Sequence, residues 1–359
     1  MAEEGGLIKG LEGVVAAETA LCDLDGAGGR LAYRGYGIDE LARQATYEEV
    51  AHLLWRGELP TRAQLDGFTA ELAAARPVPE PLLAAFRLLP KAVDPMRALQ
   101  LSATMLGTFD PEAPDNSHEA NLRKALRLTS QLATAICSHH RIRLGKEPVA
   151  PSKDLGHAAN FLFMLTGGRP SAVNVRAFDA SLILYAEHEM NASTFTTRVI
   201  SSTLSDMHSA VAGGIGAIKG PLHGGAGEAV MRTLQEIGKV ENVDAFVEKA
   251  LAQKRRLMGF GHRVYRAGDP RAAVLRGLAE EACRLSGQGM WFEMAVRLHE
   301  RVNRAKGLIP NVDFYSAPLF YALGIPVDLF TPVIVAGRIA GWTAHLLEQY
   351  QDKDRKSVV

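Results

Sequence analysis

The chain has 359 residues, 47% of them hydrophobic, and its 40 basic and 40 acidic side chains cancel to a net charge of zero. This size and composition predict a globular protein with a large core, in one large domain or two unequal ones. The balanced charge argues against nucleic acid or an anionic membrane as a partner, and no uncharged apolar run reaches the roughly 18 residues of a membrane span.

Cysteine usage and the N-terminal sequence favour a reducing compartment. Cys22, Cys137 and Cys283 are far apart and form no CxxC pair, so they provide neither a disulfide framework nor a zinc ligand set. Residues 1–6 are acidic and lack the basic start and apolar stretch of an export signal. We therefore expect a soluble, cytoplasmic protein.

Strand signals are confined to the N-terminal segment. Val14-Val15 and Leu31–Tyr33 flank the turn-rich stretch Asp23–Arg30. Two short β-favouring runs around such a stretch predict a small β hairpin.

Helix signals dominate the remainder of the chain. Thr46–Glu49 and Thr61–Gln64 are capping boxes in front of amphipathic patterns. The apolar positions of 155–162 share one helix face, and this segment is expected to stop at Gly167-Gly168. Asn242 is expected to cap another helix. The pattern predicts a mostly α protein with a short N-terminal hairpin.

Glycine is most concentrated between Gly213 and Gly227, where it occupies seven of fifteen positions. We read this stretch as the clearest irregular segment of the chain. The alternative for Gly213–Gly220 is a tightly packed helix crossing, because glycine lets two helices approach closely.

Histidine, arginine, aspartate and glycine gather in the segments Gly220–Ala226, Gly259–Arg271 and Pro310–Ser316. Common motifs do not fit them: Lys219 and Val264 stand where a dinucleotide fingerprint needs glycine, and no GxSxG elbow occurs. The His188-Glu189 pair lacks the second helical histidine of a zinc protease. Nicotinamide, metal and serine-hydrolase chemistry therefore lose support.

Acid and base catalysis on an anionic substrate remains. His223 and His262 lie beside glycines, which let a ligand approach an imidazole that titrates near neutral pH. The stretch Lys254–Arg271 carries six cations against the single acid Asp269, and arginine forks bind carboxylate or phosphate. The alternatives are a solvated helix face for this stretch and a helix N-cap for Asp313.

The motifs Pro221–Ala226, Gly259–Tyr265, Asp269–Arg271 and Pro310–Ser316 together resemble the citrate synthase family in order and spacing. The similarity extends over nearly the whole chain. It implies a citrate synthase-like, mostly α fold, in which a smaller helical domain of residues 225–324 is inserted into a large helical domain of residues 1–224 and 325–359. It also implies an active site in the cleft between the domains and a homodimer.

The resemblance implies a catalytic centre of His223, His262 and Asp313. In this family reaction, Asp313 would remove a methyl proton from acetyl-CoA while His223 stabilises the enol or enolate. His262 would donate a proton to the carbonyl oxygen of oxaloacetate as the new bond forms, and the citryl-CoA intermediate would be hydrolysed to citrate and CoA.

Binding residues follow from the same resemblance. His188, Arg271 and Arg338 would bind oxaloacetate. The residues implied to contact the CoA moiety are Leu222, Gly259, Phe260, Gly261, Arg266, Lys306 and Asn311. No metal and no permanently bound cofactor is implied, because acetyl-CoA and CoA act as a co-substrate pair.

The chain departs from the family in its C-terminal segment, where relatives carry an arginine that reaches the partner subunit's active site. Residues 351–359 contain no Arg-Pro sequence, and Arg355 or Lys356 would have to replace that arginine. Three alternatives to citrate synthase stay open. They are a 2-methylcitrate synthase that uses propanoyl-CoA, a catalytically weakened binding or regulatory protein of this fold, and a basic nucleic-acid module built on Lys254–Arg271.

Overall fold

Helices dominate the computed structural model, which describes residues 15–352. The helices are α1 (Ile38–Gln44), α2 (Tyr47–Arg56), α3 (Arg62–Ala74), α4 (Glu80–Leu88), α5 (Pro95–Thr108), α6 (His118–Arg143), α7 (His157–Thr166), α8 (Ala172–Ala186), α9 (Ala192–Ser201), α10 (Met207–Ile218), α11 (Ala226–Ile237), α12 (Val243–Ala252), α13 (Pro270–Leu285), α14 (Gly289–Lys306), α15 (Val312–Ala322) and α16 (Phe330–Gln351). The predicted mostly α fold is confirmed. Within the described range, no helix combines the length and apolarity needed to cross a membrane.

The N-terminal strands form an antiparallel sheet in the order β1 (Cys22–Asp25), β2 (Arg30–Tyr33) and β3 (Tyr36–Gly37). The second predicted strand is confirmed, but the first was placed too early. Val15 lies outside any strand and is 85% exposed, and Val14 lies outside the described residues.

A tight turn explains this difference. The Asp25 carboxylate accepts hydrogen bonds from the main-chain N–H groups of Ala27 and Gly28, at 3.1 and 2.8 Å. This Asx turn closes the chain within a few residues, so β1 extends into the polar segment Asp23–Arg30 that the sequence predicts as turn.

The predicted helix starts and stops agree well with the structure. Both capping boxes form, at Thr46 with Glu49 and at Thr61 with Gln64, and α7 ends at Gly167 with φ of 83°. The helix start predicted at Asn242 is correct, but the predicted capping by its side chain is wrong. α12 does begin after this residue, but the side chain donates to the carbonyl of Ile237 at 2.9 Å and caps no N–H group of α12.

The glycine-rich stretch is helical over its first part, so its assignment as irregular is wrong there. α10 continues to Ile218, and its glycines form the helix crossing that was the alternative. A Cβ atom at Gly213 would lie 2.2 Å from Ile200 Cδ1, and one at Gly214 would lie 2.6 Å from Thr197 Cγ2. Close contact between α9 and α10 thus demands glycine, and only residues 219–225 form the turn that carries His223.

Substituting Gly214 with alanine is expected to lower the free energy of unfolding by about 1 to 3 kcal/mol, because the new methyl group overlaps Thr197. Gly67 is a matched control, since it lies in α3 with nothing near its Cβ position. Gly67→Ala should gain up to about 1 kcal/mol from helix propensity. Urea unfolding measures both values, and equal stability of Gly214→Ala and wild type would contradict the crossing argument.

The C-terminal helix α16 lies at the centre of the fold and contacts α2, α6, α8 and α9. It crosses α8 at main-chain distance, because Gly337 and Gly341 face that helix. Cβ atoms there would lie 2.8 Å from the carbonyl oxygen of Leu182 and 2.1 Å from that of Ala186. This crossing places Arg338 beside the C-terminal end of α8.

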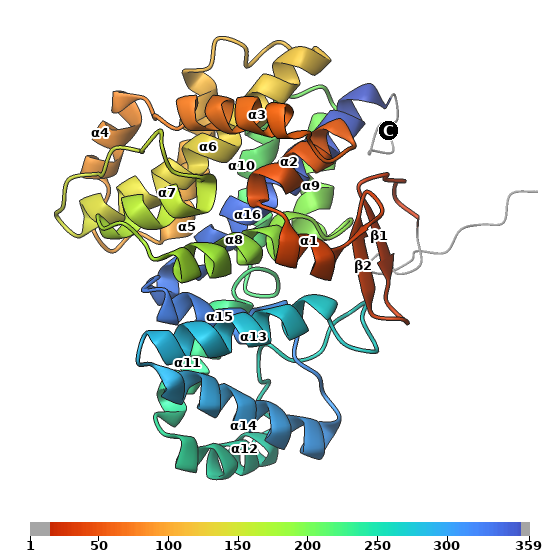
Figure 1. Cartoon of the computed structure of the whole chain (residues 1–359), viewed down its shortest axis with the longest axis vertical. Coiled ribbons are helices and arrows are strands. Elements are labelled where there is room, and N and C mark those ends of the chain that lie inside the picture. Colours follow the sequence, from red (N-terminus) through yellow and green to blue (C-terminus); the bar gives the residue numbers. More distant parts are fainter. Residues whose placement is uncertain (1–14, 353–359) are drawn as a thin grey trace, which may run out of the picture.

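Figure 1 shows α11 to α15 gathered at one end of the molecule, with α1 to α10 at the other. α13 contacts α1 and α8, and α11 contacts α16, so the two groups of helices meet at these elements. The division at residues 225–324 stays a prediction. The meeting point is nevertheless important, because residues of the predicted site come from both groups.

Candidate active site

The histidines and arginines predicted for the substrate site lie close together, although they come from distant segments. His188 follows α8, and its ring centroid lies 5.2 Å from that of His262, in the loop before α13. Arg271 lies in the first turn of α13 and Arg338 in α16. His188 and Arg271 are both buried, being 8% and 2% exposed.

The ring of His262 is fixed by its own loop. Its Nδ1 atom accepts hydrogen bonds from the main-chain N–H groups of Val264 and Tyr265, at 3.0 and 3.2 Å. Burial and the nearby Arg271 lower the pKa of His262, so the ring is neutral at neutral pH. With Nδ1 occupied as an acceptor, the single proton of the neutral ring is on Nε2, which becomes a hydrogen-bond donor.

His223 lies in the turn between α10 and α11. Its Nε2 atom lies 2.8 Å from the Ser193 hydroxyl, which donates to Oδ1 of Asn191 at 2.7 Å. Burial, followed by the charge of Arg338, lowers the pKa of His223 to about 4. The ring is therefore neutral at pH 7, and the orientation of the Ser193 hydroxyl decides which nitrogen carries its proton.

Asp313 lies in the first turn of α15 but does not cap that helix. The cap is Asn311, whose Oδ1 atom accepts from the N–H group of Asp313 at 3.1 Å. The N-cap alternative for Asp313 is therefore wrong. Its own Oδ1 atom accepts a hydrogen bond from the hydroxyl of Tyr185 at 3.0 Å. Burial raises the pKa of Asp313 to about 6, although Tyr185 and Arg271 act in the opposite direction.

The two arginines differ in what they bind. Arg271 forms a bidentate pair with Asp269, with Nε and Nη2 at 2.9 and 2.8 Å from the carboxylate oxygens. Asp269 also accepts the N–H group of Val312 at 3.0 Å, and so connects α13 to α15. Arg338 donates from Nε to the carbonyl oxygen of Tyr185 at 2.6 Å, and no carboxylate of residues 15–352 pairs with it. Its outer nitrogens are available to an anionic ligand.

His188 is held next to these arginines as a neutral ring. Its Nε2 atom lies 3.1 Å from the hydroxyl of Tyr265. Burial lowers the pKa of His188 well below its ordinary value, and the positive charges of Arg271 and Arg338 lower it further. The site thus combines a fixed positive charge with neutral hydrogen-bonding groups, which suits a small dicarboxylate.

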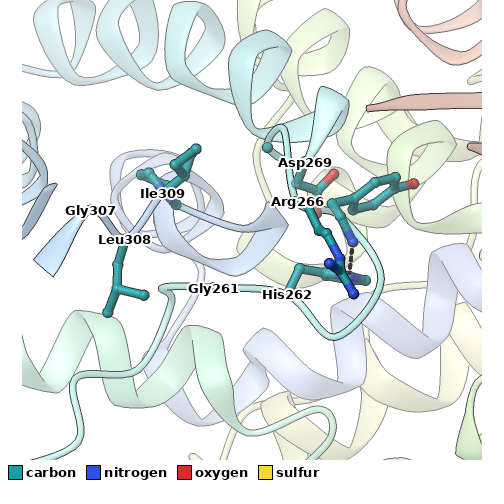
Figure 2. A pocket seen from close by; sticks show the side chains of 10 residues that line it. Gly261, His262, Arg266, Asp269, Gly307, Leu308 and Ile309 are labelled. Carbon is teal, nitrogen blue, oxygen red and sulfur yellow. Dashed lines mark hydrogen bonds between the residues drawn. The ribbon is translucent and has the colours of Figure 1, made fainter. Parts of the chain in front are cut away.

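A cavity of about 190 Å³ opens beside His262. Figure 2 shows its walls, which are formed by the His262 loop on one side and by the segment after α14 on the other. The two walls are connected by the hydrogen bonds Gly261 N–H to Ile309 O at 2.8 Å and Asn311 N–H to Gly259 O at 2.9 Å. An isolated bridge pairs Phe260 with Pro310.

The residues predicted to contact CoA are only partly brought together. Gly261 and Arg266 line the cavity, and the Asn311 amide donates to the carbonyl oxygen of Gly261 at 3.0 Å. The other five predicted residues do not line it, and two of them lie farther out along the chain. Leu222 is 83% exposed in the turn before His223, and Lys306 is the exposed last residue of α14, directly before the cavity residue Gly307.

The alternative of a solvated helix face for the basic stretch is wrong. Residues 254–269 form turns and loops, and helix α13 begins only at Pro270. The backbone there is turned by positive φ values at Gly259, Gly261 and Gly268. Within residues 15–352, no three His, Cys, Asp or Glu side chains are grouped so that they could hold a metal ion.

Four residues of the site were missing from the sequence-based selection: Tyr185, Ser193, Tyr265 and Asp269. Ser193 had a usable signal, because it follows the helix-capping Asn191 in the same short segment as the predicted site residue His188. Tyr185 gave none, since a tyrosine near the end of an apolar helix is read as core. Its function depends on the distant residue Asp313.

Comparison with known proteins now decides the family. The sequence model described as citrate synthase, C-terminal domain, matches residues 10–357. The chain belongs to the citrate synthase family. The predicted resemblance and the citrate synthase-like fold class are thereby confirmed.

Relatives and solved structures agree with this membership. Citrate synthase 2 of Bacillus subtilis is 46% identical over 345 residues, which cover 96% of this chain and 92% of that protein. The 2-methylcitrate synthase of Mycobacterium tuberculosis is 43% identical over 341 residues, or 95% and 86% of the two chains. The Thermoplasma acidophilum citrate synthase, in its ternary complex with carboxymethyl coenzyme A and oxaloacetate, superimposes with a TM-score of 0.94 at 29% identity, over 99% of this chain and 95% of that chain.

Proposed function

We propose that this citrate synthase family member condenses acetyl-CoA and oxaloacetate with water to give citrate and CoA. In enzyme terms it is an acyltransferase whose acyl group becomes an alkyl group on transfer. The observation that carries the proposal is the combination of a carboxyl group of raised pKa, Asp313, with neutral histidines and with Arg338, which no carboxylate of residues 15–352 pairs with. Such a site can remove a proton from carbon and stabilise the oxyanion that results.

The first step is removal of a methyl proton from acetyl-CoA by the Asp313 carboxylate. The methyl C–H bond breaks, its electron pair forms the enol or enolate double bond, and the proton passes to the carboxylate. Because burial raises the pKa of Asp313 to about 6, this group is a stronger base than an ordinary carboxylate, yet it is mostly ionised at pH 7 to 8.

His223 would stabilise the charge that develops on the thioester oxygen. In the structure the Ser193 hydroxyl donates to Oδ1 of Asn191. When it turns to donate to Nε2 of His223 instead, the proton of the neutral imidazole is on Nδ1 and can be donated to that oxygen. Oδ1 of Asn191 is still hydrogen-bonded in this arrangement, because it also accepts from the N–H group of Thr194 at 3.1 Å. The direction of the Ser193 hydroxyl therefore decides whether His223 has the tautomer that the reaction requires.

Carbon–carbon bond formation would then use the other histidine. The enol carbon attacks the carbonyl carbon of oxaloacetate, while the Nε2–H group of His262 donates to the carbonyl oxygen. His188, Arg271 and Arg338 would bind the carboxylates of oxaloacetate. Water finally hydrolyses the citryl-CoA thioester, and citrate and CoA are released.

The CoA moiety of acetyl-CoA would occupy the cavity beside His262. Gly261 lines this cavity, and Arg266 supplies a cation for phosphate. Gly259, Phe260 and Asn311 adjoin the lining segments, to which main-chain pairing connects them. We retain Leu222 and Lys306 as outer contacts at the edges of this site. No metal or permanently bound cofactor enters any of these steps, since acetyl-CoA is consumed as a co-substrate.

We also propose a homodimer in the cytoplasm. The dimer is supported by the family resemblance, and the cytoplasmic location by the three separated cysteines, all of which are free in the structure. Arg355 and Lys356, the candidates for an arginine that reaches the partner subunit's site, lie outside the described residues.

Activity is expected to decrease on the acidic side with a midpoint near pH 6, where Asp313 becomes protonated and can no longer act as a base. Below that midpoint, kcat/KM for acetyl-CoA should fall about tenfold per pH unit. His223 does not set this limb, because its lowered pKa of about 4 leaves it neutral throughout. Initial rates between pH 5 and 9 measure the profile, and a flat response down to pH 5 would contradict the assigned base.

The test of the proposed function is oxaloacetate-dependent thiol release, run with acetyl-CoA and with propanoyl-CoA. Citrate synthase activity requires a higher kcat/KM for acetyl-CoA. The related 2-methylcitrate synthase keeps the second candidate open, because one methyl group changes selectivity by only about 1 to 3 kcal/mol. A propanoyl-CoA preference would establish that candidate, and absence of thiol release with both donors would favour a binding or regulatory protein.

A further inference from the structure

We propose that Tyr185 is a positioning residue, which holds one oxygen of the Asp313 carboxylate so that the other faces the substrate methyl group. The inference rests on the proposed function of Asp313 as the base. Tyr185 lies in the last turn of α8 and is 3% exposed, and its hydroxyl lies 3.0 Å from Oδ1 of Asp313.

The hydrogen bonds around this hydroxyl favour donation to the carboxylate. Tyr185 has one hydroxyl proton and two acceptors, Asp313 Oδ1 at 3.0 Å and Ser316 Oγ at 2.9 Å. An ionised carboxylate is the stronger acceptor of the two. The Ser316 hydroxyl donates instead to the carbonyl oxygen of Asp313 at 3.1 Å. When Asp313 is ionised, the Tyr185 hydroxyl therefore donates its hydrogen bond to Oδ1 of Asp313.

The second carboxylate oxygen has a different environment. Within the described residues, no protein group donates a hydrogen bond to Oδ2 of Asp313. An oxygen without a donor keeps its lone pairs available to accept a proton from carbon. Tyr185 thus makes the two oxygens inequivalent, one held by the protein and one free.

The crossing between α8 and α16 holds Tyr185 in place. Its carbonyl oxygen accepts from Nε of Arg338 at 2.6 Å, and a Cβ atom at Gly337 would lie 3.2 Å from Cβ of Tyr185. The ring packs against Phe320, with the two ring centroids 6.3 Å apart. One residue therefore contacts both the arginine proposed to bind oxaloacetate and the proposed base.

The phenol remains a donor throughout the working pH range, because burial and the neighbouring Asp313 carboxylate raise the pKa of Tyr185 well above its ordinary value. A hydrogen bond to the ionised form of a carboxyl group favours ionisation. Loss of the hydroxyl should therefore make Asp313 harder to ionise and leave its carboxylate free to rotate.

The experiment compares wild type with Tyr185→Phe by two measurements. In the first, carboxyl carbons of aspartate are labelled with ¹³C and titrated by NMR, and Asp313→Asn identifies the resonance of Asp313. We expect its midpoint near pH 6 in wild type and about one pH unit higher in Tyr185→Phe. An unchanged midpoint would overturn the inference without affecting the proposed function.

The second measurement is thiol release from acetyl-CoA as a function of pH. Tyr185→Phe should lower kcat roughly ten- to hundredfold and move the acidic midpoint upward, with little change in the KM for oxaloacetate. A role confined to packing would leave the midpoint in place, and that result would also overturn the inference. Absence of thiol release from wild type would reject the proposed function and the catalytic part of the inference together.

Tyr350→Phe is the matched control for loss of a tyrosine hydroxyl. The hydroxyl of Tyr350 donates to the carbonyl oxygen of Ser205 at 2.6 Å, near the end of α16. This bond makes no contact with Asp313. We expect the control to lose stability by no more than Tyr185→Phe does, while its acidic midpoint and kcat stay at the wild-type values.

Discussion

Replacement of Asp313 with asparagine is expected to lower kcat for oxaloacetate-dependent thiol release by about 10³-fold or more, the upper part of the range for removal of a general base. Asparagine has nearly the same shape, and its amide oxygen can still accept the hydrogen bond from Tyr185. It cannot accept a proton from carbon. Steady-state rates with saturating acetyl-CoA and oxaloacetate measure the loss, and a decrease of less than tenfold would contradict the assignment of Asp313 as the base.

The free energy of unfolding provides the control for this substitution. The sign of its change shows whether Asp313→Asn is inactive because it lacks the base or because it misfolds. Burial raises the pKa of Asp313 from 3.8 to about 6, so the folded state binds the proton more tightly than the unfolded state does. Folding is therefore favoured at low pH and loses stability as pH rises toward 6. At pH 8 the neutral asparagine should stabilise the fold by up to about 3 kcal/mol. A variant that was inactive because it misfolded would be less stable than wild type.

Replacement of Arg338 with glutamine is expected to lower kcat/KM for oxaloacetate by about 10²- to 10³-fold, since a buried cation that pairs with a ligand carboxylate contributes several kcal/mol. Glutamine retains an amide N–H that can donate to the carbonyl oxygen of Tyr185. The KM for acetyl-CoA at saturating oxaloacetate should change little. Initial rates at varied oxaloacetate measure the effect, and an unchanged KM for oxaloacetate would remove Arg338 from the binding site.

Arg338 is a better test than Arg271. Replacing Arg271 would also leave Asp269 as a buried unpaired carboxylate and disturb its bond to Val312. Arg297→Gln is the matched control, because Arg297 forms an exposed ion pair with Asp244 at 2.6 Å. Surface pairs of this kind contribute little, so the control should retain wild-type kinetics.

The parts of the fold that local chemistry determines could be predicted from the sequence. The capping boxes at Thr46 and Thr61 and the stop at Gly167 each depend on residues within one turn of the helix end. The errors occurred where distant contacts decide. Gly213 and Gly214 favour a turn by composition, but the contact with α9 makes their lack of a side chain a packing requirement.

The same distinction applies to the site. Motifs identified His262 and Asp313, whose neighbours in sequence also form their local environment. No sequence pattern could reveal that Arg271 is paired with Asp269 while Arg338 has no carboxylate partner in the part of the chain that the structure describes, because both are arginines in helical segments. Tyr185 was missed for the related reason that its partner Asp313 is 128 residues away.

The contact between α8 and α16 sets how the site can respond to change elsewhere in the molecule. At Gly337 and Gly341, α16 presents no side chain to the main chain of α8, so α16 has no rotamer at these two positions that could repack. Mutations or heating that loosen the side-chain core would shift other helix pairs before this one. The spacing between Arg338 and Tyr185 should thus stay the same when residues elsewhere in the core are substituted or the protein is heated. The amide protons of α8 and α16 should be among the slowest to exchange with solvent.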